Sequence, residues 1–303
     1  SEVLWKDDYA LGEMRYLMIA VIVPIYNTEK YLRETIDSVI CQTLSFAEHI
    51  RLILLDDAST DGSFAICEQY QKQYPKQILV KHYDTNQGVS ALRNEGVRIA
   101  GEMGDELITF LDSDDKLADD AMEKAVQYFD AHEDVFVAAI GIRYFDAYEG
   151  EQRLNWRFEK TDVVDIKKDY TYPHYYVGGV FLRHAVLDEL HFDESLSFWE
   201  DALAVNQVIV SQGKYGLIAG THYYYRKRED ESSLVDTAWH KKERYTTLLS
   251  SGYGQLFAYS RKKHHRIIPY VQYMVAYHMR LMMMKSKQSI IEEILSEEEL
   301  AAL

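Results

Sequence analysis

The residues with the clearest chemical potential are three carboxylates that follow a short apolar run. Asp112, Asp114 and Asp115 come directly after residues 107–111, which are apolar except for one threonine. A run of this length predicts a buried strand, whose end lies at the edge where open α/β sheets bind ligands. Carboxylates this close repel one another unless a cation is bound, and hard oxygen ligands suit Mg²⁺ or Mn²⁺ with substrate phosphates completing the shell. The alternative is that Asp112 or Asp115 caps a helix that begins near Leu117.

Three other polar stretches follow predicted strands in the same way. Val-Pro-Ile-Tyr-Asn occupies residues 23–27, an Asp- and Ser-rich stretch occupies 56–63, and a third stretch at 86–94 opens a predicted helix. Tyr26 could stack on a flat ring, and helix amide groups together with Arg93 could face an anion. Taken singly, these stretches could equally build turns and helix caps. Because they follow successive strands, we expect them to converge with the carboxylates on one crevice, which turns alone do not require.

The elements that must position these residues alternate regularly at first. Apolar runs predict strands at 19–24, 50–55, 78–83 and before Asp112, with helices at 28–42 (Thr28 as N-cap), 63–74 and 88–100. This alternation predicts parallel βαβ units and a Rossmann-like half of about a hundred residues. The pattern then becomes mixed. Strands are predicted at 135–144, 177–182 and 215–225, a helix at 199–211, an edge strand or long loop at 156–166, and about three helices from 239 onward, interrupted at Pro269.

Composition and charge limit the classes of protein that the chain could be. Its 303 residues are 47% hydrophobic and 27% charged, which is ordinary for a globular protein with a sizeable core. The formal net charge of −16 argues against nucleic acid as the main partner. Cys41 and Cys67 lie in predicted helices without metal-ligand spacing, so we interpret them as buried thiols in a reducing cytosol. The first apolar run, at 17–23, is too short to span a membrane and no signal peptide is seen, so a cytosolic protein is expected.

Together, the polar stretches resemble the motifs of the family 2 glycosyltransferases of GT-A fold, and the resemblance covers roughly residues 18–230. The family's Val-Pro-x-Tyr-Asn stands at 23–27, its Gln-Thr at 42–43, its Asp-Asp-x-Ser-x-Asp-Gly at 56–62 and its Asp-x-Asp-Asp at 112–115. Its Asn-x-Gly-x-x-x-Ala-Arg-Asn motif stands at 86–94, with the alanine one place earlier.

The resemblance implies a role for each matching residue. Asp112 would lie near the ribose of a nucleotide sugar, and Asp114 would ligate the Mn²⁺ or Mg²⁺ that bridges the diphosphate. Asp201 would be the general base that deprotonates the acceptor hydroxyl; the alternative is that Glu200 and Asp201 only complement a helix dipole. The residues that would hold the nucleotide base and ribose are Pro24, Tyr26, Asp56, Asn86 and Arg93.

The last predicted strand adds cationic groups to this site. Tyr225, Arg226 and Arg228, followed by serines at 232–233, resemble the family's mobile loop over the diphosphate. Arginine suits a diphosphate because its guanidinium group pairs with two oxygens at once. His222 would be a further metal ligand, as in some members of the family. A lone histidine on an aromatic strand is, however, more often simply packed.

We therefore predict an inverting glycosyltransferase that moves a sugar from a nucleotide-diphosphate sugar, with UDP as the first choice, to a hydroxyl of a cell-surface glycan or polymer. The expected fold class is α/β, with a GT-A Rossmann-like nucleotide-binding sheet continuing into a mixed acceptor-side sheet, plus a C-terminal helical segment. The expected domains are an N-terminal extension at 1–17, the GT-A domain at 18–235 and helices at 236–303. An inactive sugar-binding module is the main alternative, although it should have lost Asp114 or Asp201. A receiver-like switch domain is a further alternative, but such a domain would be about half the length of this chain.

The predicted C-terminal helices carry a positive charge that the family resemblance does not explain. Thirteen basic and five acidic residues lie between positions 226 and 287, beside an apolar stretch at 267–277. One interpretation is a packed helix with a solvated basic face. The other is a docking surface for an anionic polymer, the inner face of a membrane or a further domain, since each Lys or Arg near an anionic surface adds about 1 kcal/mol.

Overall fold

The structure is a computed structural model that describes residues 17–228, 238–282, 284–296 and 298–299. The expected N-terminal extension, except for Leu17, therefore lies outside the described residues. The same holds for the expected domain boundary at 235–236 and for the serines at 232–233. The carbonyl oxygen of Leu17 lies 3.2 Å from Nδ1 of His49, so the described chain begins against the rest of the domain.

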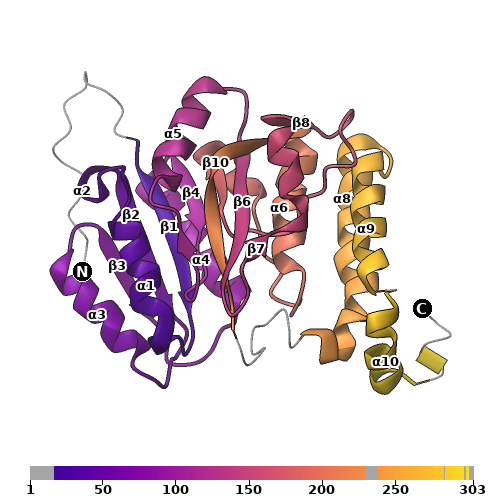
Figure 1. Cartoon of the computed structure of the whole chain (residues 1–303), viewed down its shortest axis with the longest axis horizontal. Coiled ribbons are helices and arrows are strands. Elements are labelled where there is room, and N and C mark those ends of the chain that lie inside the picture. Colours follow the sequence, from indigo (N-terminus) through magenta and orange to yellow (C-terminus); the bar gives the residue numbers. More distant parts are fainter. Residues whose placement is uncertain (1–16, 229–237, 283, 297, 300–303) are drawn as a thin grey trace.

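The N-terminal half is the parallel sheet expected from its apolar runs (Figure 1). Its strands are β1 (Ile19–Ile25), β2 (Ile50–Asp56), β3 (Ile78–His82) and β4 (Leu107–Phe110), in the order β3-β2-β1-β4. The helices are α1 (Glu29–Ile40), the short α2 (Phe46–His49), α3 (Ser63–Gln73) and α4 (Val89–Met103). The strands are nearly continuous apolar runs because helices cover both faces of a parallel sheet. Their carboxyl ends meet at one edge, as expected.

The second half extends the same sheet with strands of mixed direction. β9 (Val180–Arg183) pairs antiparallel with β4 and with β6 (Val137–Asp146), and β10 (Lys214–Lys227) lies parallel to β6. The short strands are β5 (Lys116–Leu117), β7 (Gly150–Glu151) and β8 (Val163–Asp165). The helices are α5 (Ala121–Ala131) and α6 (Glu200–Gln212), with 3₁₀ turns η1 (Arg153–Glu159) and η2 (His184–Glu189). The predicted mixed α/β fold is confirmed.

Three local predictions differ from the structure. Leu117 belongs to β5, which pairs with β10, so the helix expected near it begins only at Ala121. Thr28 occupies the N-cap position of α1 but makes no capping bond through its side chain. Cys41, at the end of α1, is exposed, whereas Cys67 is buried. Burial raises the pKa of the Cys67 thiol to about 12, so this thiol is inert at neutral pH.

Apolar side chains on the two faces of the sheet form two separate cores. Helices α1, α3 and α5 cover one face, and helices α4 and α6 cover the other. The C-terminal helices add to the second core. The carboxyl edge of the sheet lies between these two helical layers, so side chains from both halves of the chain can reach it.

The C-terminal segment packs on α6 as a helical layer of its own. Three turns, η3 (Ala238–His240), η4 (Lys242–Arg244) and η5 (Leu248–Tyr253), lead into α8 (Gly254–His264), α9 (Pro269–Met282) and α10 (Lys285–Ile294). Pro269 begins α9, where its missing N–H costs nothing. Tyr270, Val271 and Met274 are fully buried, and the Tyr270 hydroxyl donates to Oδ1 of Asn206 on α6 at 2.8 Å. The apolar stretch is thus core, as the first interpretation of these helices expected.

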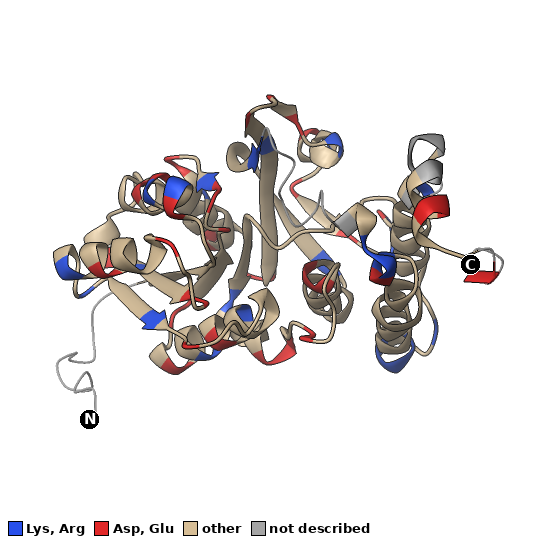
Figure 2. Cartoon of the chain, turned by 90° about the horizontal axis from the view of Figure 1, so that it is seen from below, with Lys and Arg blue, Asp and Glu red and all other residues tan. Residues whose placement is uncertain are grey.

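Charge is spread widely over the molecule. Figure 2 shows acidic and basic segments interspersed along the described chain in this view. Basic residues do gather at the end of α8, where Arg261, Lys262 and Lys263 fall in the last helical turn. Basic side chains at the C-terminus of a helix interact favourably with the negative end of its dipole. Within the described residues, no helix is both long enough and apolar enough to cross a bilayer.

Candidate active site

Asp115 fastens the loop after β4 to strand β10. Its Oδ2 accepts a hydrogen bond from the Tyr223 hydroxyl at 2.7 Å, and its Oδ1 accepts one from the backbone N–H of Arg226 at 2.7 Å. The Tyr223 oxygen in turn accepts the N–H of Asp112 at 3.1 Å. Burial, reinforced by the nearby carboxylates of Asp114 and Asp112, raises the pKa of Asp115 well above its ordinary value. Asp115 is therefore an anchor, which leaves Asp112 and Asp114 to face a ligand.

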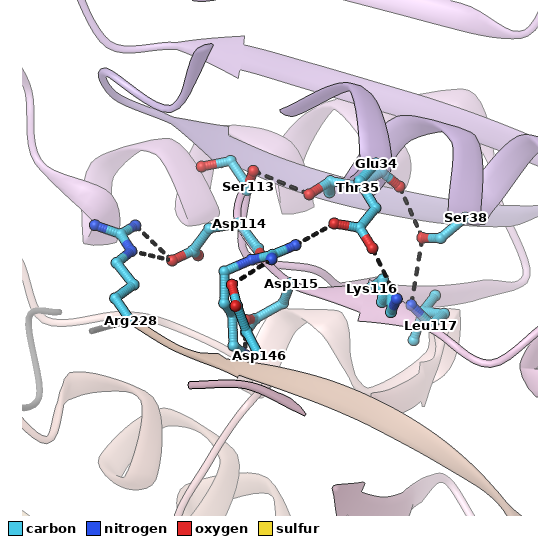
Figure 3. Close-up of polar contacts among 11 residues, drawn as sticks. Glu34, Thr35, Ser38, Ser113, Asp114, Asp115, Lys116, Leu117, Asp146 and Arg228 are labelled. Carbon is cyan, nitrogen blue, oxygen red and sulfur yellow. Dashed lines mark hydrogen bonds and ion pairs between the residues drawn. The ribbon is translucent and has the colours of Figure 1, made fainter. Parts of the chain in front are cut away.

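Asp114 is paired with Arg228, as Figure 3 shows. Its Oδ2 accepts Nε of Arg228 at 3.0 Å and also the Nη2 group. Burial raises the pKa of Asp114, an effect that the Arg228 guanidinium opposes. Asp114 and Arg228, both predicted to act at the diphosphate, thus lie together. The expected serines beyond Arg228 lie outside the described residues.

Arg226 lies two residues before Arg228 but has different partners. Its Nε donates to the carbonyl of Asp114 at 2.7 Å, its Nη1 donates to Asp146 at 2.8 Å, and its Nη2 pairs with Glu34. The side chain is only 7% exposed and lies over the ring of Phe145 at 4.4 Å. The two carboxylates raise the pKa of Arg226 against the opposing effect of burial. This geometry makes Arg226 a support for the Asp114 loop.

Arg93 joins Asp112, after β4, to the N-terminus of α6. Its Nη2 donates to Oδ1 of Asp112 at 3.0 Å, and its Nη1 donates to Oε1 of Glu200 at 2.9 Å. The side chain is buried against the ring of Phe192, 5.5 Å from the ring centroid. Its positive charge persists although burial opposes it, because Asp112, Glu200 and Asp201 raise its pKa. Residues separated by about a hundred positions are thereby held in one site.

Asp201, the predicted base, lies in the first turn of α6. Burial and the adjacent Glu200 raise the pKa of Asp201 to about 7, while Arg93 opposes this rise. A carboxylate with a pKa near 7 has the proton affinity that general-base chemistry needs at neutral pH. The preceding Trp199 has φ 71° and ψ 8°, a left-handed conformation that is strained for a tryptophan. Strain of this kind gathers at functional sites, where neighbouring structure holds it in place.

The end of β2 carries the residue expected to recognise the nucleotide base. Asp56 is fully buried, and its Oδ2 bonds to Nδ1 of His82 at 2.7 Å and to the N–H of Ser59 at 3.2 Å. Its Oδ1 has no hydrogen-bond partner among the described residues. The ring of Phe64 lies 4.3 Å from that of His82. Sequence analysis missed His82, whose only signal was its place at the end of β3.

The other residues predicted for the base and ribose lie around the same edge. Pro24 is buried at the end of β1, while Tyr26 is 52% exposed and Asn86 is exposed. The amide of Asn86 donates to the carbonyl of Asp57 at 3.4 Å. The Asp57 side chain accepts the N–H groups of residues 87 and 88 at 2.6 and 2.9 Å. Asp57 therefore shapes the loop after β3, a role that the sequence did not indicate.

The donor set at the carboxylate edge fits a hard divalent cation only in part. Oδ2 of Asp112 and Oδ1 of Asp114 make no hydrogen bond within the described part of the chain, so each carboxylate keeps an oxygen for a metal. In the chain as described, no group of three His, Cys, Asp or Glu side chains could hold a metal. A two-carboxylate site suits a cation whose shell is completed by substrate phosphates and water.

The structure does not bring His222 to this donor set. His222 and Tyr223 are neighbours on β10 and point to opposite faces, and Tyr223 reaches Asp115. The His222 ring instead lies beside Glu151, with 3.9 Å between Nε2 and Oε1. It lines a cavity of about 590 Å³ with residues of η1 and the β10 bulge. We therefore withdraw His222 from the expected ligand set.

A parallel βα sheet that continues into mixed strands, with carboxylates at its edge, is the fold of the GT-A glycosyltransferases. Crystal structures of S. aureus TarS 1-349 share it: one in complex with UDP has a TM-score of 0.70 at 21% identity, over 94% of this chain and 77% of that one. The chain belongs to glycosyl transferase family 2, because the model of that family matches residues 20–191.

Two relatives from Bacillus subtilis (strain 168) resemble most of the chain. It is 40% identical over 284 residues to the minor teichoic acid biosynthesis protein GgaA, covering 93% of this chain and 63% of that protein. It is 36% identical over 265 residues to the minor teichoic acid biosynthesis protein GgaB, covering 86% of this chain and 29% of that protein. The chain thus spans less than two thirds of the length of either relative.

Proposed function

We propose that the chain is an inverting glycosyltransferase that transfers a sugar from a UDP-sugar to a hydroxyl of a cell-surface polymer of the teichoic acid kind. The observation that carries the proposal is the Arg93 bridge, because it holds Asp112 of the donor edge beside Glu200 and Asp201. The names of GgaA and GgaB support the polymer, and the UDP complex of TarS supports the nucleotide. The reaction would take place in the cytoplasm, at the inner face of the membrane when the acceptor is membrane-attached.

In the proposed reaction, Asp201 takes the proton of the acceptor hydroxyl as its oxygen attacks the anomeric carbon of the donor sugar. The bond from that carbon to the diphosphate breaks on the opposite face, and the electron pair leaves with the diphosphate. This single displacement inverts the anomeric configuration. Arg228 is placed to pair with the departing diphosphate oxygens. Mn²⁺ or Mg²⁺ held by Asp112 and Asp114 would supply further charge neutralisation there.

The nucleotide end of the donor would lie over β1–β3. The unpartnered Oδ1 of Asp56 suits an N–H donor, which uracil presents on its imide edge and cytosine lacks at that position. Tyr26 is exposed enough to stack on the base, with Pro24 and Asn86 beside it. His82 would hold Asp56 in the required orientation.

Nucleotide binding is expected to depend on a divalent cation through Asp114. Asp114→Ala should weaken UDP affinity in the presence of Mn²⁺ at least tenfold, because it removes a metal-binding oxygen and the ion pair with Arg228. Calorimetric titration of UDP with and without EDTA measures this. Asp119→Ala, which removes an exposed carboxylate just after β5, is the matched control. Unchanged UDP affinity in both Asp114→Ala and EDTA would remove the metal from the proposal.

The rate of transfer is expected to rise with pH and to level off above about 7. Asp201 acts only as the carboxylate, and its pKa is raised to about 7, so protonation removes the base below that value. Values of kcat/KM should fall by about tenfold per pH unit on the acidic side. UDP affinity measured over the same range separates this effect from donor binding. A rate independent of pH between about 5 and 8 would contradict the assignment.

The donor itself is best identified with a panel of UDP-, GDP- and CDP-sugars scored for hydrolysis in the absence of acceptor. Hydrolysis of UDP-sugars above the others supports the proposal. Binding of UDP without hydrolysis of any sugar of the panel would favour the alternative of an inactive sugar-binding module. A preference for GDP- or CDP-sugars would keep the reaction class and change the nucleotide.

A further inference from the structure

Arg244, in turn η4, is a buried cation with no anionic partner among the described residues. Its side chain is 3% exposed, and the guanidinium carbon lies 4.0 Å from the ring centroid of Phe198 and 3.7 Å from that of Trp239. Its Nε and Nη1 each expose less than 1 Å² and make no hydrogen bond in the described structure. The guanidinium group thus lies against two aromatic rings, with two of its three nitrogens buried and unsatisfied.

The other buried arginines of the described chain show how unusual this is. Arg93 pairs with Asp112 and Glu200. Arg157 is fully buried, and it donates to the carbonyl of Leu154 at 2.9 Å and to the Tyr215 hydroxyl at 2.8 Å, besides other oxygens. A buried charge without such partners is costly, and a bound ion is one way in which a protein can satisfy it.

Burial also lowers the pKa of Arg244, to about 10. This value is still well above neutral pH, so the side chain keeps its positive charge under physiological conditions. The cost of the unpaired charge therefore remains, and loss of the proton does not remove it. An anion is the species that would do so.

Arg244 lies on the acceptor side of the proposed active site. Phe198, which packs on it, stands three residues before Asp201 in the chain. Trp199, the next residue, also has a buried indole N–H without an acceptor. The Trp199 ring packs against Tyr253, with 4.9 Å between ring centroids, and against His278 at 5.8 Å. The His278 ring also lies 6.0 Å from that of Phe198, so both unsatisfied donors border one aromatic cluster, and a ligand that satisfies them must offer hydrogen-bond acceptors.

We propose that Arg244 and the indole N–H of Trp199 form a subsite for a phosphate group of the acceptor, next to the base Asp201. This inference rests on the proposed function, and it assigns the acceptor to the phosphate-bearing polymers. Phosphate is favoured because a guanidinium group pairs with two of its oxygens at once. Since Nε and Nη1 are covered, phosphate reaches them only when the ring of Phe198 or Trp239 moves aside.

The test uses the full chain, with inorganic phosphate and glycerol 3-phosphate as probes and glycerol as the uncharged comparison. Either phosphate, at 100 times its Kd, should raise the melting temperature of the wild type by about 5 °C, whereas glycerol should not. Arg244→Met should abolish the shift. Lys242→Met is the matched control, because Lys242 is a cation of the same turn that pairs with Glu299 at the surface.

The same measurement is repeated with saturating UDP and Mn²⁺, because free phosphate could instead bind where the donor diphosphate binds. A shift that survives UDP and disappears only in Arg244→Met supports the subsite. Equal shifts in the wild type and Arg244→Met, loss of the shift on adding UDP, or no shift in the wild type would each overturn it.

A structural role for Arg244 gives a different result. If Arg244→Met and Arg244→Gln both melt well below the wild type without phosphate, the residue serves as a packing partner of the two rings and the proposal fails. Under the proposal, Arg244→Met is at least as stable as the ligand-free wild type, because a buried unpaired charge has been replaced by an apolar side chain. If the protein transfers no sugar, the proposed function fails. The phosphate-binding measurements would still decide whether the subsite exists.

Discussion

Replacement of Asp201 by asparagine is expected to lower sugar transfer by about 10²–10⁴-fold, the usual contribution of a general base. The amide has the shape of the carboxylate and can still accept the N–H of Ala202, which now donates to Oδ1 of Asp201 at 2.6 Å. It cannot, however, take a proton from the acceptor hydroxyl at neutral pH. UDP affinity and melting temperature should therefore stay near the wild-type values. Initial rates of transfer, with donor and acceptor both saturating, measure the effect.

Asp188→Asn is the matched control for this substitution, because Asp188 is an exposed carboxylate on turn η2 of the same half of the molecule. Its rate should equal that of the wild type. Transfer by the Asp201→Asn enzyme within a few-fold of wild type would show that another group accepts the proton. Glu200, the adjacent carboxylate, would then be the first candidate to examine, although its ion pair with Arg93 makes it a weaker base.

Truncation after Lys263 is expected to prevent the chain from folding. It removes α9, whose Val271, Met274 and Val275, together with Ile268, lie in the same core as α6. Burial of an apolar side chain of this size stabilises a fold by about 1.5–3 kcal/mol. Losing four of them approaches the whole stability of a typical domain, about 5–15 kcal/mol. Circular dichroism and size-exclusion chromatography of the truncated chain measure the outcome.

A shorter truncation after Leu295 provides the comparison, because it keeps the buried Leu295 and removes only residues beyond it. That chain should fold and bind UDP like the full one. A chain ending at Lys263 that remains folded, binds UDP and loses only its affinity for anionic polymers or vesicles would support the docking interpretation of these helices. The buried contacts of α9 argue for the opposite result.

The elements that carry the site could be predicted because their sequence patterns are local. Strands buried on both faces are continuous apolar runs, and polar stretches at the ends of β1, β2 and β4 had to meet at one edge of a parallel sheet. The helix near Leu117 was wrong because β10 recruits this segment into the sheet, and that pairing joins residues about a hundred positions apart. Local periodicity contains no information on such a pairing.

The partners of the charged residues could not be predicted either. Arg226 and Arg228 look equivalent in the sequence, yet the first pairs with Glu34 and Asp146 and the second with Asp114. Both guanidinium groups lie over the ring of Tyr31, at 4.7 and 5.1 Å from its centroid, so the difference between them lies in the carboxylates that the surrounding segments bring to each. Such choices depend on the tertiary arrangement of the helices and strands that surround the edge.

The Arg93 bridge also limits which parts of the protein can be exchanged with those of a related enzyme. The guanidinium group comes from α4, Asp112 from the end of β4, and Glu200 from α6, so the pairing crosses from the donor half to the acceptor half. Removing Arg93 leaves the largely buried carboxylate of Glu200 without its cation, and unpairing a buried charge typically costs about 3–5 kcal/mol. A chimaera that combines the donor half of one enzyme with the acceptor half of another must therefore inherit these three residues as a set. Exchange of sugar or acceptor specificity by shuffling halves should succeed only where that set is intact.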